Sequence, residues 1–283
     1  TPPPGRARAA AVHPYYQQLV GRPGALLEIP PARYKYSLPQ LAQITHGRPI
    51  FGGYLARSPD YPLPEEAPVL SALWRVDLPA DPLMIEGMDD PLVPLNYYGV
   101  GDLVVHWDKI YPEQRALIPQ LIERVLPGVT PEYQDATISV YHVPSATPQP
   151  FAGIVGEGWY PAESDGAHSW RWMGASGAIL IVNPTSAALP VTLSLGAYGY
   201  GGSREVALSF DDDPAGLWQV EAGETTAALH LWLAPGSHRL TLQARADQES
   251  VANSSRALSI ALLDARITIA AAAEAVSEQA DHR

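Results

Sequence analysis

The sequence predicts an α/β plus all-β protein, in which a small α/β domain is followed by an antiparallel β-sandwich of the jelly-roll type. Residues 103–143 read as strand, helix and strand, an order typical of an α/β unit. After residue 175 the chain becomes a series of short strand-like runs separated by turns, which favours a sandwich. The two sequence patterns meet at Ser145–Pro150 (SATPQP), which we take as the domain boundary.

This boundary divides the chain into four segments. They are a linker at 1–13, a small α/β domain at 14–148, a β-sandwich at 151–270 and a C-terminal tail at 271–283. The linker is rich in Pro and Ala, and its apolar residues have no regular spacing. The tail has the composition of a helix but no apolar face that could pack on a core. We therefore expect packed cores only in the two middle segments.

The α/β domain is predicted from its apolar patterns. A short helix at 14–20 precedes an apolar run at 25–30 that is closed by prolines and suits a buried strand. Leu103–Trp107 predicts a second buried strand. Pro112–Leu126 predicts one amphipathic helix, and 137–143 alternates like a strand. The proline-rich stretch 58–94 is expected to be mostly irregular, apart from a helix-like run at 69–74, and 36–48 to be partly helical.

The sandwich is predicted from seven short runs. They lie at 178–182, 189–195, 205–210, 218–220, 226–233, 238–244 and 258–266. Asn-Pro, Gly-Gly, Asp-Asp-Asp-Pro and Pro-Gly turns separate them.

Composition excludes several classes of function. The 283 residues carry a net charge of -12, which argues against a nucleic-acid partner because phosphate binding needs a basic face. The absence of cysteine removes disulfides, thiolate metal sites and cysteine nucleophiles. No stretch is apolar enough for a membrane helix, and the start at Thr1 suggests a fragment or a processed form.

Four motifs in order carry a resemblance to a known family. They are His46–Tyr54 (HGRPIFGGY), Tyr98–His106 (YGVGDLVVH), Gly158–Tyr160 with Glu163 (GWY..E), and Trp170–Met173 followed by Ala178, Leu180, Ile181 and Asn183–Pro184 (WRWM…A.L.I.NP). The set resembles the extracytoplasmic part of bacterial polytopic membrane proteins of the glycosyltransferase C superfamily, which are dolichyl-phosphate-mannose mannosyltransferase-like, and their uncharacterised relatives. It covers most of residues 25–185.

The resemblance implies that many membrane helices precede this portion, which would face the outside of the bacterial cell membrane. The membrane part, where such enzymes use a lipid-linked sugar, is not contained in these residues. No catalytic residue is therefore carried over to this chain, and no cofactor or metal is expected.

Aromatic residues after the boundary are the best candidates for a ligand site. Trp170 and Trp172 must share one face of their strand, with Arg171 on the other. Trp159, Tyr160, Trp170 and Trp172 would stack on sugar rings as in carbohydrate-binding-module-like sandwiches, with Arg171, Glu163 and Asp165 as polar neighbours. Two other interpretations stay open, namely that these aromatics are core residues or that they join the two domains.

Other polar groups are weaker candidates. His46 and Arg48 would form a ligand-binding cluster, or else His46 caps a tight loop in which Gly47, Gly52 and Gly53 are needed. Asp211–Asp213 would bind calcium or, more simply, form a solvated turn. The acidic and basic groups at 102, 106, 108, 157, 163, 165 and 168 would supply the carboxylate pair of a glycoside hydrolase, but no nucleophile or metal motif accompanies them.

We therefore expect a non-catalytic extracytoplasmic domain of a membrane glycosyltransferase-like protein, which recognises a glycan or a lipid-linked sugar. The alternatives are a secreted glycoside hydrolase with a carbohydrate-binding module and a structural cap without a ligand.

Overall fold

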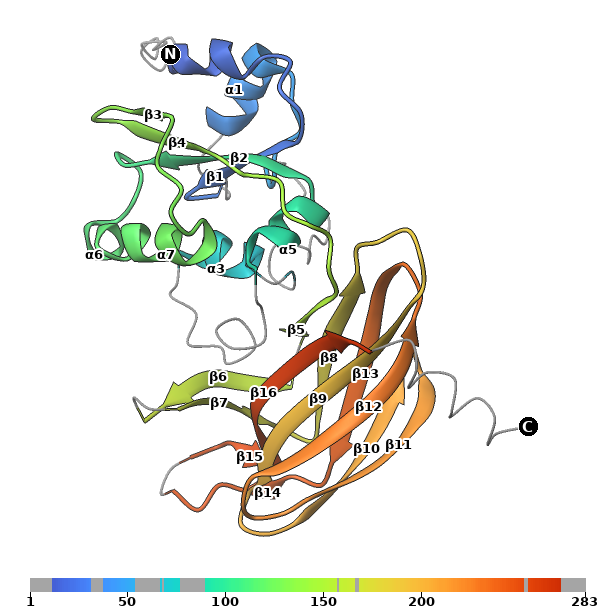
Figure 1. Cartoon of the computed structure of the whole chain (residues 1–283). Coiled ribbons are helices and arrows are strands. Elements are labelled where there is room, and N and C mark those ends of the chain that lie inside the picture. Colours follow the sequence, from blue (N-terminus) through green and yellow to red (C-terminus); the bar gives the residue numbers. More distant parts are fainter. Residues whose placement is uncertain are drawn as a thin grey trace, which may run out of the picture.

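The computed structural model describes residues 12–31, 38–53, 67, 69–76, 90–156, 158–165, 168–251 and 254–270 (Figure 1). Most of the predicted linker, the predicted tail, Tyr54 and Glu157 lie outside the described residues. Among the residues that are described, no helix is both long and apolar enough to span a membrane.

The first part of the chain is built on a four-stranded sheet. Its order is β1 (Ala25–Ile29), β2 (Val100–His106), β4 (Ile138–His142) and β3 (Tyr133–Gln134). β1 runs parallel to β2, and β4 is antiparallel to β2. Parallel strands need a long crossover, and residues 30–99 supply it.

Helices cover both faces of this sheet (Figure 1). On one face η1 (Pro14–Leu19) and α1 (Leu38–His46) pack on Leu26, Val104 and Val140. On the other face α3 (Leu70–Arg75) and α7 (Leu117–Val125) contribute to a larger core that includes Leu27, Leu103 and Val105, and α6 (Pro112–Arg115) precedes α7 without a buried residue. The near-continuous apolar runs of β1 and β2 follow from burial on both faces.

Two helical details differ from the sequence expectation. The single helix predicted at 112–126 is divided into α6 and α7, with Pro119 in the first turn of α7. Proline has no N–H to bond the carbonyl of Arg115, so the first helix ends there. A further short helix, α5 (Leu92–Tyr97), begins in the stretch expected to be irregular, and its Pro94 lies in the first turn, where proline is tolerated.

The second part is a sandwich of two five-stranded antiparallel sheets. One sheet contains, in spatial order, β11 (Asp213–Val220), β10 (Arg204–Phe210), β13 (Gly236–Ala244), β8 (Ser176–Asn183) and β5 (Phe151–Val155). The other contains β12 (Thr225–Leu233), β9 (Leu189–Gly199), β16 (Ile260–Ile269), β7 (Ser169–Met173) and β6 (Trp159–Ser164). A short pair, β14 (Asp247–Gln248) and β15 (Ala257–Leu258), lies at one end.

One core fills the space between the two sheets, with Ile179, Leu193, Leu240 and Leu262 at its centre. The chain passes repeatedly from one sheet to the other, as in jelly rolls. Every regular element among the described residues from 151 to 270 is a strand. The predicted fold class, an α/β part followed by an antiparallel β-sandwich, is confirmed.

The two parts meet where α5 packs on the sandwich. Val93 of α5 packs with Phe151 and Val182 in a small apolar cluster. The Tyr97 hydroxyl lies 3.0 Å from the Ser237 hydroxyl. Trp159 and Tyr160, the candidates for residues that join the two parts, do not belong to this cluster: Trp159 packs against the core between the two sheets, and Tyr160 packs with Trp172.

Candidate functional site

Five aromatic side chains gather on the outer face of the sheet that contains β6, β7, β9 and β16. This aromatic cluster consists of Tyr160, Trp170, Trp172, Tyr198 and Tyr200, which pack around Leu258 and Ala261. It is separate from the core between the two sheets.

Strand alternation places these residues together. Met173 points into the sandwich core, so Trp172 and Trp170 point to the opposite face of β7. Ala261 of β16 pairs with Trp172 on one side and with Tyr198 of β9 on the other. Because Ala261 has only a methyl group, the rings of its two neighbours can meet above it.

Trp172 is the centre of the cluster. The rings of Tyr198 and Tyr200 meet it edge to face, with centroid distances of 5.2 and 5.4 Å. Trp172 is 9% exposed, whereas Tyr160, Trp170, Tyr198 and Tyr200 are half-buried. The cluster is thus a packed aromatic surface whose outer members are partly exposed to solvent.

Charged groups border the cluster. The Arg256 guanidinium lies 5.4 Å from the centre of the Tyr160 ring and 2.5 Å from a carboxylate oxygen of Glu163. It also donates to both oxygens of Glu249, at 2.5 and 2.9 Å. These hydrogen bonds, and one from Ser254, lower the pKa of Glu249 to about 2. Glu249 therefore stays ionised at neutral pH.

Burial raises the pKa of Tyr198, and the nearby carboxylates of Glu163 and Asp165 raise it further. Its hydroxyl therefore stays protonated and able to donate a hydrogen bond at neutral pH. The predicted polar neighbours Glu163 and Asp165 do come near the aromatic cluster.

Trp159 and Arg171 do not belong to the cluster. Trp159 packs against the sandwich core, and its indole N–H donates to the carbonyl of Ala178 at 3.0 Å. Trp159 pairs with Met173, which points inward, so of the two roles considered for Trp159, stacking on a sugar or packing in the core, the structure shows the core role. Arg171 is on the face opposite Trp170, as the alternation predicted.

Sequence reasoning missed Tyr198, Tyr200, Glu249 and Arg256. The two tyrosines stand two positions apart in the run Ala197–Tyr200, a spacing that places both on one strand face. This spacing could have identified the two tyrosines from the sequence. Nothing local linked Glu249 or Arg256 to the aromatic residues.

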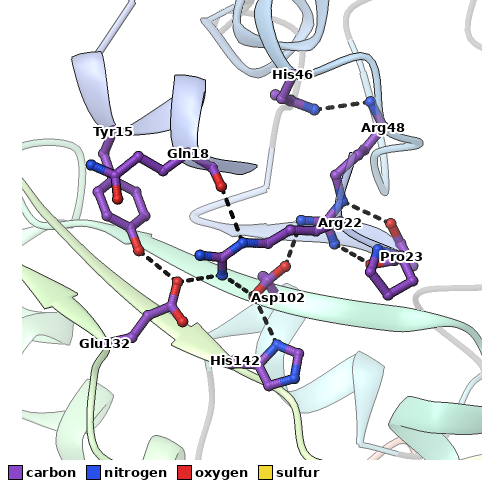
Figure 2. A network of polar contacts seen from close by, with 10 residues as sticks. Tyr15, Gln18, Arg22, Pro23, His46, Arg48, Asp102, Glu132 and His142 are labelled. Carbon is purple, nitrogen blue, oxygen red and sulfur yellow. Dashed lines mark hydrogen bonds and ion pairs between the residues drawn. The ribbon is translucent and has the colours of Figure 1, made fainter. Parts of the chain in front are cut away.

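His46 ends α1 and Arg48 lies in the loop that follows it, in a polar network around the buried carboxylate of Asp102 on β2 (Figure 2). Arg48 donates to Asp102 at 2.5 Å and to the carbonyls of Pro23 and Gly24 at 2.7 and 2.9 Å. Arg22 lies 3.6 Å from the same carboxylate, and His142 lies 3.1 Å from it. The network ties the loop before β1 to β2. Its charged groups are therefore paired with one another and with backbone carbonyls of the protein.

His46 closes the turn that precedes Arg48. Its Nδ1 accepts the backbone N–H of Arg48 at 3.1 Å, and its ring stacks on Tyr16 with centroids 5.6 Å apart. Gly47, Gly52 and Gly53 all have positive φ. This geometry matches the interpretation of His46 as the cap of a tight loop.

Burial lowers the pKa of His46 below 6.5, although the charge of Glu28 opposes the shift. The unfolded chain takes up a proton at this histidine as the pH falls through 6.5, while the folded chain resists it. We therefore expect the free energy of unfolding, measured by urea titration, to fall between pH 7.5 and 5.5. His46→Asn should reduce that slope; an equal slope in the variant and in the unchanged protein would contradict this assignment.

The carboxylates considered for hydrolysis are engaged in local structure. Glu163 pairs with Arg256, and Asp165 accepts the backbone N–H of His168 at 2.7 Å. Asp211 in the segment considered for calcium binding accepts the backbone N–H of Arg239 and contacts His238. The Asp211–Asp213 segment is therefore a turn held by hydrogen bonds. Within the described residues, no group of three or more His, Asp or Glu side chains could hold a metal ion.

No protein-family model matches the sequence, and no curated protein matches it. Several solved structures resemble part of the chain. One is a family two carbohydrate esterase from Clostridium thermocellum in complex with cellohexaose, with 20% identity and a TM-score of 0.28, over 42% of this chain and 33% of the esterase. Family 35 carbohydrate binding modules from an environmental isolate and from Clostridium thermocellum are 19% and 11% identical, with TM-scores of 0.23 and 0.29. These matches cover 42% and 44% of this chain and 82% and 100% of the modules. Likeness at this level carries no conclusion about a ligand.

Proposed function

We propose that this chain is a non-catalytic carbohydrate-recognition part of a larger extracytoplasmic protein, and that the aromatic cluster is its sugar-binding surface. The observation that carries the proposal is the position of the cluster outside the sandwich core. Four of its five aromatic residues are half-buried and so remain partly exposed to solvent.

The cluster has the two kinds of group that sugar recognition uses. Flat aromatic faces cover the apolar C–H face of a pyranose ring, and charged or hydroxyl groups at the edge bind its hydroxyls. Here Glu163, Arg256 and the Tyr198 hydroxyl supply the second kind. Arg256 is held by two carboxylates, so these groups are arranged before a ligand arrives.

The larger context of the proposal rests on the four sequence motifs. In that context the chain follows a membrane part of the glycosyltransferase C type and helps to orient a glycan or a lipid-linked sugar. Reading the open reading frame upstream of Thr1 tests this: a multi-helix membrane region supports it, and a soluble neighbour contradicts it. The sugar-binding surface is tested separately, on the chain itself.

Trp170→Ala tests the sugar-binding surface. A neutral disaccharide selected on a glycan array should bind the variant at least about tenfold more weakly, because an aromatic anchor contributes about 2 kcal/mol. Trp232→Ala is the matched control, since Trp232 is 62% exposed on β12, an edge strand of the same sheet that is separated from β7 by β9 and β16. Titration calorimetry measures both, and circular dichroism checks that both are folded.

Two results would overturn this function. One is a glycan array without any bound sugar at millimolar concentration. The other is an equal loss of disaccharide binding in the Trp170 and Trp232 variants, because the binding would then not depend on the aromatic cluster.

A further inference from the structure

The outer face of the sheet that bears the aromatic cluster continues beyond it along β9, where Thr192 and Ser194 are half-buried. Val191, Leu193 and Leu195 of β9 point into the sandwich core, so the residues between them point outward. We call this surface the outer lane, and its residues are Thr192, Ser194 and Gly196 of β9, Ala228 of β12, and Arg266 and Thr268 of β16.

The outer lane has small side chains along β9 and aromatic residues at both ends. Ser194 stands between Ala228 and Arg266 in one cross-strand row. At one end Tyr198 belongs to the aromatic cluster, and at the other Trp232 pairs with Pro190 and is 62% exposed. Tyr198 and Pro190 are eight positions apart on β9, which spans about 26 Å at a strand rise of about 3.3 Å per residue.

The polar groups of the outer lane suit an uncharged polyhydroxyl chain. The Asp264 carboxylate lies over Gly196, where a side-chain carbon would overlap its Oδ1. Arg266 is exposed one row further on, so one negative and one positive charge balance each other. The Thr192 hydroxyl lies 3.1 Å from Nδ1 of His230, and Ser194 and Thr268 add further hydroxyls.

We propose that the outer lane binds an extended neutral glycan of several sugar units, with one end stacked on the aromatic cluster and the other on Trp232. This inference rests on the proposed function and deepens it by naming the class of ligand. The balanced charges favour a neutral chain over a polyanionic one, because a polyanion would face Asp264 without an excess of cations.

The test compares chain lengths on the intact chain. The probes are cello-, xylo- and manno-oligosaccharides of two and six units, titrated by calorimetry. In the series that binds, the hexasaccharide should bind at least about tenfold more tightly than the disaccharide. Trp232→Ala and Ala228→Lys should each lower this ratio below about threefold and leave disaccharide binding unchanged. Both positions are exposed on an edge strand, so both variants should fold.

The outcomes separate the two proposals. Equal affinity for both lengths, or a length effect that survives both variants, overturns the outer lane and leaves the sugar-binding surface intact. Tighter binding of a galacturonic acid hexasaccharide than of every neutral hexasaccharide overturns the neutral ligand class. If no disaccharide or hexasaccharide binds the wild-type chain, the sugar-binding function itself is overturned.

Discussion

Asp102→Ala is expected to lower the free energy of unfolding of the α/β part by about 3–5 kcal/mol, because it leaves a buried cation without its partner. The side chains of Arg48 and Asp102 are only 4% and 1% exposed. Arg48 cannot reach water without breaking its bonds to the carbonyls of Pro23 and Gly24. Urea denaturation followed by circular dichroism measures the effect.

Two control variants show whether the buried charge is the cause. Arg22→Met removes a cation that is 31% exposed and 3.6 Å from the same carboxylate, and should cost no more than about 1 kcal/mol. The double variant Arg48→Met, Asp102→Leu removes both buried charges and should be more stable than Asp102→Ala alone. If Asp102→Ala costs no more than Arg22→Met, the network of Figure 2 does not stabilise the loop as described.

Gly158→Ala is expected to destabilise the sandwich by about 3 kcal/mol or more, since a clash adds to backbone strain. Gly158 has a φ of +96°, and a Cβ there would overlap the backbone carbonyl oxygen of Ser176. Its own carbonyl accepts the N–H of Gly174 at 2.7 Å, which holds the start of β6 against the turn after β7. Backbone atoms on both sides leave little room for relaxation. Thermal unfolding monitored by tryptophan fluorescence measures the loss.

Gly201→Ala is the matched control for this prediction. Gly201 has a φ of +65°, and no atom lies within 4 Å of the place of its Cβ. This variant carries the cost of positive φ without the clash, so it should lose only about 1 kcal/mol. Equal losses in the two variants would show that the contact with Ser176 is unimportant.

Strand alternation made part of the candidate site predictable. Because successive side chains on a strand point to opposite faces, the sequence alone placed Trp170 and Trp172 together and Arg171 apart. The same rule could not place Trp159, since the sequence did not show how β6 pairs with β7. Trp159 is opposite Met173, a core residue, and a register shift follows before Ala162.

The sequence by itself determined the two-part fold class and the candidate sugar-binding strand Ser169–Met173, because apolar periodicity and turn residues act over a few positions. Only the tertiary structure decided which face of that strand is the core and which polar groups border the aromatic cluster. Arg256 and Glu163 are 93 positions apart, and Arg48 and Asp102 are 54 apart. Such pairs form only after the sheets have packed, and no local pattern in the chain encodes which distant carboxylate a given arginine will meet.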